Sequence, residues 1–370
     1  MGINIKIAEL RKMKNVSQQE LGDYLGVTFQ SVSKWETRKA LPDIELLPLI
    51  AKYFQVSVDE VLGLKPIKSA PYEPRDTDNR NNWVDKDSIF KNRQFFWNAD
   101  YLRFLVQEVW KLDKPIDVAE IRCGNGELGK LLMGLLPEGS TYTGIDSKFF
   151  IEKAKENMGR ENYVTSFIES DIYDLKAANK YNLCICQANL RHMNKPLDVL
   201  QIMKNAVKEN GLVVCIELNR EIENVGLYIN GMDYGELCTS FDWHKLWLKE
   251  LEAEGRDYAV GMRIPFYMKQ IGLKSVDVRM NDKITFITPE SEDYIKACED
   301  FASFRGYNFC FEGEGAEQTI KFFMSRGYTR DEMEKYCLSH NKITNYLSHN
   351  MGRLSFLMIF GFLITYGRKK

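Results

Sequence analysis

Features that mark several other protein classes are scarce or missing in this chain of 370 residues. The longest apolar run, residues 354–366, has about 13 residues, whereas a membrane-spanning helix needs roughly 20, so we predict a buried strand there and no membrane partner. The eight cysteines lack the paired spacing of metal ligands, which favours reduced core thiols and no bound metal. The N-terminus has no charged start followed by an apolar segment, so we expect a cytoplasmic protein.

An excess of charge of one sign is also missing, because 50 Lys and Arg residues stand against 52 Asp and Glu residues, for a formal net charge of −2. The molecule as a whole is therefore no polycation. Residues 1–41 differ, since seven basic residues minus four acidic residues leave a local net charge of +3. This modest basic face is the first indication of a nucleic-acid partner. With 44% hydrophobic content, the chain can bury the cores of two or three domains.

The first 65 residues predict a small all-α bundle. Apolar residues recur at helical spacing over residues 3–13. Ser17 begins a capping box for a second helix, which Gly26 ends, and Thr28 then caps a third. Two short helices around a glycine-containing turn are typical of a helix-turn-helix. A fourth helix begins at Pro42. Its apolar stripe, and the segment that closes the core, comprise Ile44, Leu47, Ile50, Ala51, Phe54 and residues 58–62.

The stretch Ser-Gln-Gln-Glu-Leu-Gly-Asp-Tyr-Leu-Gly-Val-Thr-Phe-Gln-Ser-Val-Ser-Lys-Trp-Glu, residues 17–36, resembles the lambda-repressor/Cro (XRE) type of DNA-binding domain, and the resemblance covers about residues 3–64. It implies a homodimer whose third helices enter the major groove of double-stranded operator DNA. Gln30 can bond to adenine, Phe29 can pack on a thymine methyl, and Lys34 can donate to guanine. The implied DNA-binding residues are Gln18, Thr28, Phe29, Gln30, Ser31, Lys34 and Arg38. The alternative is a helical bundle that makes protein contacts only.

Residues 66–90 are predicted to be a linker between a head at residues 1–65 and a second domain at residues 91–370, since prolines and polar residues break the periodicity there. An aromatic-rich helix is predicted over residues 92–110. Beyond it, apolar runs alternate with helical patterns, which indicates a parallel sheet covered on both faces. Strands are predicted at 116–121, 141–145, 163–168, 183–187 and 212–218, and helices at 128–136, 149–158 and 196–208.

Ligands of such sheets bind at the carboxyl ends of the strands, where three features follow one another. The first is the glycine-rich loop Glu120-Ile-Arg-Cys-Gly-Asn-Gly. The second is Asp146, whose carboxylate can accept both hydroxyls of a ribose. The third is Asp171, placed to bond an adenine amino group, with Ile172 beside it to pack on the ring. A glycine-rich loop alone would also fit a dinucleotide enzyme.

Together these features resemble the class I S-adenosylmethionine-dependent methyltransferases, over about residues 90–290 and 354–369, which makes a nicotinamide enzyme the less favoured interpretation. The resemblance implies a Rossmann-like α/β sheet of seven strands with the last antiparallel, a helical insertion at about 290–350 before that strand, and S-adenosyl-L-methionine as cofactor. The implied cofactor-binding residues are Glu120, Cys123, Gly124, Gly126, Asp146, Asp171, Ile172 and Gln187. Arg122 stands where the family has its first glycine. Its side chain would swing outward, or meet the cofactor carboxylate, or obstruct the site, and the sequence leaves these alternatives open.

The sequence defines the molecule that would accept the methyl group less well. His192, just after the fourth strand, is the candidate catalytic residue for proton transfer, and the alternative is a structural histidine. Neither the Asp/Asn-Pro-Pro-aromatic motif of amino-directed DNA methyltransferases nor the Pro-Cys of cytosine-C5 enzymes occurs, so a small-molecule acceptor is favoured. Candidate pocket residues are Glu217, Asn219, Arg220, Trp243, His244, Trp247 and Tyr258. The aromatic-rich insertion predicts a lid over an apolar acceptor, a dimer surface, or ordinary packing.

The leading hypothesis from the sequence is a DNA-binding transcriptional regulator with an S-adenosylmethionine-dependent methyltransferase domain that acts on a small molecule. The principal alternative is a transcription factor whose degenerate second domain senses S-adenosylmethionine or another metabolite without turnover. A third possibility is a scaffold for protein interactions.

Overall fold

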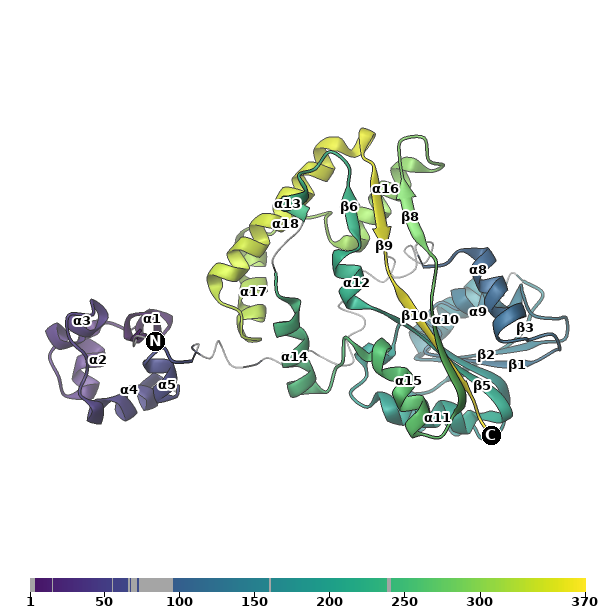
Figure 1. Ribbon diagram of the computed structural model, residues 1–370, viewed down its shortest axis with the longest axis horizontal. Helices are drawn as coiled ribbons and strands as arrows, with labels where there is room; N and C mark the ends of the chain where they lie inside the picture. Colours follow the sequence, from purple (N-terminus) through teal and green to yellow (C-terminus); the bar gives the residue numbers. More distant parts are fainter. Residues whose placement is uncertain are drawn as a thin grey trace. The chain divides into compact units, whose positions relative to one another are not determined.

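The computed structural model divides into two compact units, Met1–Glu73 with Gln318–Met333, and Pro74–Glu317 with Glu334–Lys370 (Figure 1). The residues that it describes are 4–14, 16–54, 56–65, 67, 72, 96–159, 161–237 and 241–370. The predicted linker, residues 66–90, therefore lies outside the described residues except for Ile67 and Tyr72. Its boundaries remain a prediction.

The N-terminal segment forms the predicted helical bundle. Its helices are α1 (Ile7–Met13), α2 (Gln18–Leu25), α3 (Phe29–Glu36), the 3-10 turn η1 (Ile44–Leu46), α4 (Leu47–Phe54) and α5 (Val58–Val61). Ser17 and Glu20 form the expected capping box at α2, and Gly26 ends that helix with φ +68°. Thr28 caps α3 by accepting a hydrogen bond from the backbone N–H of Ser31. The helix caps and the glycine turn that the sequence predicts are therefore present in the structure.

The core of this bundle gathers one apolar face from each helix. Ile7, Leu21, Val32, Ile50 and Val61 are all fully buried. The predicted stripe was wrong at Ile44, which is 78% exposed. The reason is that residues 44–46 form a tighter 3-10 turn, which takes Ile44 out of phase with the α-helical stripe of α4.

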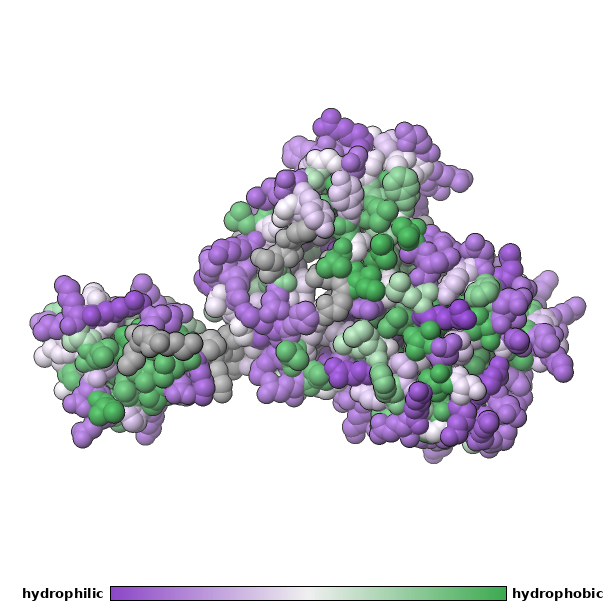
Figure 2. All heavy atoms as spheres, viewed as in Figure 1, coloured by the Kyte–Doolittle hydropathy of each residue, from purple (hydrophilic) through white to green (hydrophobic). Residues whose placement is uncertain are grey.

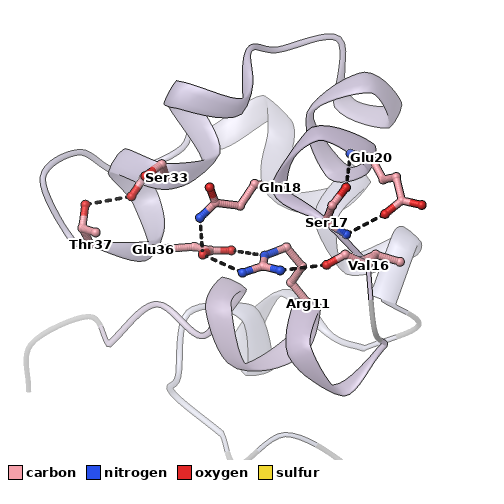
Figure 3. Close-up of polar contacts among 8 residues, drawn as sticks. All are labelled: Arg11, Val16, Ser17, Gln18, Glu20, Ser33, Glu36 and Thr37. Carbon is pink, nitrogen blue, oxygen red and sulfur yellow. Dashed lines mark hydrogen bonds and ion pairs between the residues drawn. The ribbon is translucent and has the colours of Figure 1, made fainter.

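An ion pair ties α1 to α3 within this bundle (Figure 3). The Arg11 guanidinium donates to both carboxylate oxygens of Glu36, at 2.5 and 3.1 Å, and to the carbonyl oxygen of Val16 at 2.8 Å. The side-chain amide of Gln18, at the start of α2, donates to the same carboxylate at 2.7 Å. Burial works against the charged Glu36 carboxyl, but the bonds from Arg11 and Gln18 outweigh it and lower its pKa. Three helices thus share one carboxylate.

The second segment contains a seven-stranded sheet, which confirms the predicted fold class. Its strand order is β3-β2-β1-β4-β5-β10-β7. Strands β1 to β5 pair in parallel, and β10 is antiparallel to both neighbours. The strands are β1 (Asp117–Ile121), β2 (Thr141–Asp146), β3 (Val164–Glu169), β4 (Tyr181–Gln187), β5 (Val207–Leu218), β7 (Lys274–Met280) and β10 (Phe362–Arg368).

Helices cover both faces of this sheet. The helices on one face are α8 (Ala99–Phe104), α9 (Glu127–Met133) and α10 (Lys148–Met158), and those on the other are α11 (Pro196–Ala206) and α15 (Val260–Gln270). Strand β4 shows why its apolar run is continuous: Leu183 and Ile185 pack on the first face, while Cys184 and Cys186 pack on the second. The prediction that cysteines here serve as reduced core thiols is confirmed for these two, which are free and buried. Of the helix expected over residues 92–110, residues 92–95 lie outside the described residues; residues 96–98 are not helical, and α8 begins at Ala99 and continues as the π-helical turn Leu105–Val109.

A second, three-stranded sheet was not predicted. Its order is β6-β9-β8, from β6 (Leu227–Ile229), β9 (Phe356–Ile359) and β8 (Ile284–Ile287), and these strands lie side by side in Figure 1. The single strand expected over residues 354–366 was wrong, because Gly361, at φ +65°, divides it between the two sheets. Figure 2 shows hydrophobic side chains gathered over β8 and β9.

The remaining elements lie between these strands. They are α12 (Arg220–Val225), α13 (Tyr234–Leu237), α14 (Trp243–Glu254), α16 (Tyr294–Arg305), α17 (Gly313–Met324), α18 (Arg330–Asn350) and the 3-10 turn η6 (Met351–Arg353). The aromatic-rich segment before the last strand is thus mostly helical, as the sequence predicts. None of the described helices combines the length and apolar character of a bilayer-crossing segment.

The shared carboxylate of Glu36 leads to a stability prediction. Glu36→Gln should destabilise the bundle by roughly 1–3 kcal/mol at pH 7, because Arg11 then loses its charged partner. Since the folded-state pKa of Glu36 is lowered, its stabilising effect is present above the unfolded pKa of about 4.3 and is lost as the pH falls through the folded value. Hydrogen exchange of the α3 amides at pH 7 and pH 3 would measure this, and an equal penalty at both values would contradict it.

Candidate functional site

Helix α3 carries most of the residues predicted to read DNA. Phe29 is 46% exposed on this helix, and the side chains of Gln30 and Lys34 are also exposed. Within the described part of the chain, the side chains of Gln30 and Lys34 make no hydrogen bond or ion pair. An exposed apolar ring beside uncommitted polar groups has no folding reason, and it is suited to base edges in a major groove.

Four other predicted DNA-binding residues already have intramolecular contacts. Gln18 donates to Glu36, which leaves its amide oxygen for another partner. The hydroxyls of Thr28 and Ser31 lie 3.1 Å apart at the N-terminus of α3. Arg38, at φ +60°, donates to the side chain of Asn4 and remains exposed. These contacts hold the four side chains in place around the helix-turn-helix. That these residues bind DNA stays a prediction.

In the second unit, a pocket of about 650 Å³ lies at the carboxyl edge of β1 to β4. It brings together four of the predicted site residues from three different strand ends: Asp146, Asp171, Ile172 and His192. The parallel pairing of these strands explains the convergence, because their carboxyl ends share one edge. Asp146 is 2% exposed, and its two oxygens accept from the backbone N–H groups of Gly124 at 2.9 Å and Ser147 at 2.7 Å.

The glycine-rich loop is built around that carboxylate. Gly124 and Gly126 have φ values of +58° and +76°, a conformation that side chains rarely adopt. A Cβ at Gly126 would lie 2.9 Å from the sulfur of Met158, so this glycine permits close packing of the loop on α10. Cys123 is fully buried beneath the loop, and Glu120 accepts a hydrogen bond from the Tyr142 hydroxyl at 2.7 Å. Glu120, Cys123 and Gly126 therefore support the loop and do not line the pocket.

Arg122 has a left-handed backbone conformation, at φ +52°, of the kind that favours glycine. Its side chain lines the pocket, and its guanidinium lies 3.1 Å from the sulfur of Met193. Its carbonyl oxygen accepts from the side-chain amide of Asn189 at 3.2 Å. Of the three alternatives for Arg122, the outward swing is therefore excluded in this conformation.

Gln187, at the end of β4, lies away from the pocket. It is 4% exposed, and its side-chain oxygen accepts from the indole N–H of Trp97 at 3.3 Å. Trp97 precedes α8, so the side chain to which the resemblance assigns a cofactor contact already has an intramolecular partner. Contact between Gln187 and a ligand would require Trp97 to move or to form part of the site.

His192 ends the short turn η5 (Leu190–His192) and lines the pocket. Burial lowers its pKa well below the ordinary value, and the charges of Arg191, Arg220, Arg122 and Arg256 lower it further. The imidazole is therefore neutral near pH 7 and able to accept a proton. This state is the one that a general base requires.

Glu217, at the end of β5, positions that turn. One carboxylate oxygen accepts from the backbone N–H groups of Asn189 at 2.7 Å and Leu190 at 2.6 Å, and the other lies 3.6 Å from Arg191. Glu217 is 1% exposed, and burial raises its pKa although Arg191 and the two N–H groups act in the opposite direction. Glu217 acts on the site through the turn that carries His192.

A second pocket, of about 500 Å³, lies beyond the end of β5. Its aromatic lining consists of Tyr234, Trp243, Trp247, Tyr258, Phe304, Tyr307 and Tyr336. Trp243, Trp247 and Tyr258 were candidate pocket residues from the sequence, and Phe304, Tyr307 and Tyr336 come from the aromatic-rich segment before the last strand. Arg220, Glu223 and Arg305 add charged groups to the lining. His244 is not among the lining residues, since it packs on Trp247 and pairs with Asp242 at 3.3 Å.

Sequence reasoning missed several residues of these pockets. Arg256, 4% exposed, reaches the first pocket from the loop after α14, and its Nε lies 2.6 Å from Glu254. Arg305 reaches the second pocket from α16. No local pattern marks either arginine, because both are brought to the site by tertiary packing alone. Tyr173 had a detectable signal, since it directly follows the predicted Asp171-Ile172 pair.

Two family models match separate parts of the chain. Residues 7–61 match a helix-turn-helix family, and residues 112–255 match a methyltransferase domain. Both resemblances seen in the sequence are thereby confirmed.

Individual relatives likewise match either the helix-turn-helix or the methyltransferase part of the chain. The HTH-type transcriptional activator BcrR of Enterococcus faecalis is 37% identical over 82 residues, 22% of this chain and 38% of that protein. The ubiquinone biosynthesis O-methyltransferase of Vibrio parahaemolyticus is 31% identical over 119 residues, 31% of this chain and 49% of that protein. The chain thus spans half or less of the length of these two relatives. A solved phosphoethanolamine N-methyltransferase 2 from Haemonchus contortus, in complex with S-adenosyl-L-methionine, is 13% identical with a TM-score of 0.43, covering 80% of this chain and 59% of that one.

Proposed function

We propose that this protein is a DNA-binding regulator, acting in the cytoplasm as a homodimer, whose second segment transfers a methyl group from S-adenosyl-L-methionine to a small molecule. The observation that carries the proposal is the pocket at the carboxyl edge, where Asp146, Asp171 and His192 converge from three strand ends. The helix-turn-helix supplies the DNA-reading part of the proposal. The domain boundaries that we propose remain residues 1–65, 66–90 and 91–370.

The residues present fit the adenosyl part of that cofactor. Asp146 offers a carboxylate of the kind that accepts hydrogen bonds from ribose hydroxyls, and backbone N–H groups hold it at the pocket. Ile172 and Phe150, both nearly buried, provide apolar walls for a purine, and Asp171 can accept from its amino group. Arg122 presents a cation inside the pocket, which suits the carboxylate of the methionine part.

When bound, the cofactor supplies a methyl group on a positively charged sulfur. The chain's own contribution is mostly alignment and the exclusion of water. His192 adds a neutral base, held by a turn that Glu217 fixes through two backbone N–H groups. An acceptor hydroxyl would give its proton to this imidazole, and the surrounding arginines would keep that proton transient.

Asp146→Ala tests the ribose assignment. We expect calorimetry to show at least a tenfold loss of affinity for S-adenosylmethionine, because two charge-assisted hydrogen bonds disappear. Asp174→Ala, in the turn that follows Asp171, is a control outside the pocket lining. Unchanged affinity in a folded Asp146 variant would exclude the adenosyl site from this position.

Arg122 gives weight to a second candidate function, a sensor that binds the cofactor without turnover. Arg122→Gly restores the smaller residue and keeps the left-handed backbone. If the arginine binds the cofactor carboxylate, the glycine variant should lose roughly tenfold in affinity; if it obstructs the site, affinity should rise. Binding without methylated product on any acceptor, in both variants, would favour the sensor over the enzyme.

The base assignment predicts a pH profile. Because the folded-state pKa of His192 lies well below its usual value of about 6.5, methyl transfer should stay high as the pH falls past 6.5. It should decline only when the pH falls below the folded-state pKa. For stability, the neutral folded imidazole costs nothing above 6.5 and becomes destabilising as the pH falls below that value. His192→Asn should lower kcat while cofactor affinity stays the same. An unchanged kcat would reduce His192 to a structural role.

The head can be tested separately on operator DNA. Gln30→Ala should lose discrimination at an adenine, costing about 1–3 kcal/mol on the operator and little on other sequences. Arg38→Ala should weaken binding on all sequences and reduce its salt dependence, because a phosphate contact carries no sequence information. Titrations at several salt concentrations measure both. An identical loss on every sequence for Gln30→Ala would contradict the placement of α3 in the groove.

A further inference from the structure

The second pocket has the chemistry of a binding site for a flat, negatively charged molecule. Its walls are mostly aromatic, and two pairs of these rings contact each other. Trp243 lies edge-on to Tyr336 with ring centroids 5.8 Å apart, and Trp247 stacks on Tyr258 at 6.5 Å with an interplanar angle of 28°. Flat walls of this kind are suited to stacking on an aromatic ring.

The charged groups of the lining do not balance. Arg220 and Arg305 bring two positive charges, whereas Glu223 is the one carboxylate that lines the described pocket. Glu223 is 8% exposed, and although burial opposes its ionised form, Arg220 and Arg305 lower its pKa, so its charge is already committed. Arg220 forms an ion pair with it, and Arg305 donates to its backbone carbonyl at 3.1 Å. The Arg305 guanidinium therefore makes no ion pair with a carboxylate of the described lining.

Among the described residues, the neighbouring groups Arg191 and His340 add no unpaired negative charge to the lining. Arg191 is paired with Glu217, so that pair cancels. His340, 7% exposed, contacts the carbonyl oxygen of Gly306 through Nε2 at 2.9 Å, and its buried Nδ1 has no hydrogen-bond partner. Burial lowers the pKa of His340, so its imidazole adds no charge to the lining. A partly buried guanidinium beside aromatic walls is stabilised when an anion pairs with it.

The second pocket also lies next to the turn that carries His192, the base that we propose for an acceptor hydroxyl. Arg220 follows β5, the strand next to β4, and its charge acts on His192 in the first pocket. Tyr258, which lines the second pocket, lies 5.9 Å from the Arg220 guanidinium. A ligand in the second pocket would thus be next to the turn that carries His192.

We propose that this aromatic pocket binds an aromatic carboxylate, whose ring packs between the tryptophan and tyrosine walls and whose carboxylate pairs with Arg305 and Arg220. The inference rests on the proposed function for its biological meaning, because this molecule would be the methyl acceptor. Binding itself does not require the cofactor. The pocket would serve equally as the ligand site of a sensor.

The test uses the full chain without any methyl donor. The probe is 1-hydroxy-2-naphthoate, and its matched neutral control is 1-hydroxy-2-naphthamide, which has nearly the same shape. Quenching of tryptophan fluorescence, with calorimetry as a second readout, gives the affinities. We expect the carboxylate to bind at least tenfold more tightly than the amide, since charge-assisted bonds to guanidinium are the stronger ones. Equal affinities would overturn the proposal.

Variants assign the effect to the pocket. Arg305→Gln should weaken naphthoate binding at least tenfold while the amide changes less than threefold. Trp247→Leu should weaken both probes alike, because it removes a wall and no charge. Arg103→Gln, on the exposed side of α8, is the matched control and should change neither. If Arg305→Gln is folded and binds naphthoate as the parent does, the proposal is wrong; if it does not fold, the comparison of the two probes on the parent chain decides.

The outcome is distinguishable from that of the proposed function. A protein that binds naphthoate but no S-adenosylmethionine would retain this pocket assignment and lose the methyl transfer. A protein that binds S-adenosylmethionine and neither naphthoate nor its amide would retain the cofactor site and lose this inference.

Discussion

Parallel pairing of β1 to β5 is the constraint on which the second segment depends. It places the carboxyl ends of these strands at one edge, so residues separated by tens of positions in the chain converge there. Asp146 shows the consequence: the carboxylate that we propose to bind a ribose also accepts from the backbone N–H of Gly124. In the proposed function, loop geometry and ligand recognition are therefore coupled, and a change to either would disturb both.

Glu217 extends this coupling to the next strand. A carboxylate so deeply buried is tolerated because it accepts two backbone hydrogen bonds and lies near Arg191. In return it fixes the turn that ends at His192, between a pocket suited to an adenosyl group and a pocket lined by aromatic rings. The shared carboxylate of Glu36 plays a similar part in the head, where it holds three helices together.

Much of this could be predicted from the sequence, because strong local signals coincide with the elements they specify. The capping box at Ser17, the αL glycine at Gly26 and the apolar runs of the central strands all formed where their patterns indicate. The second sheet escaped prediction because strands of three or four residues have too little alternation to detect. Arg256 and Arg305 escaped because their positions follow from packing between distant segments.

Two arginines, one in the lining of each pocket, point to the same kind of ligand group. Arg122 puts a cation into the first pocket, and Arg305 adds a positive charge without a carboxylate partner to the lining of the second. Both positions face cavities that the proposed ligands would fill with carboxylates, one from the cofactor and one from the acceptor. Because a partly buried guanidinium is stabilised by a paired anion, the folded chain should be more stable with these ligands bound than without them. If the proposed ligands also bind one conformation of this segment more tightly than another, they would shift the equilibrium between the two, which is the physical requirement for regulation of the joined helix-turn-helix by a metabolite.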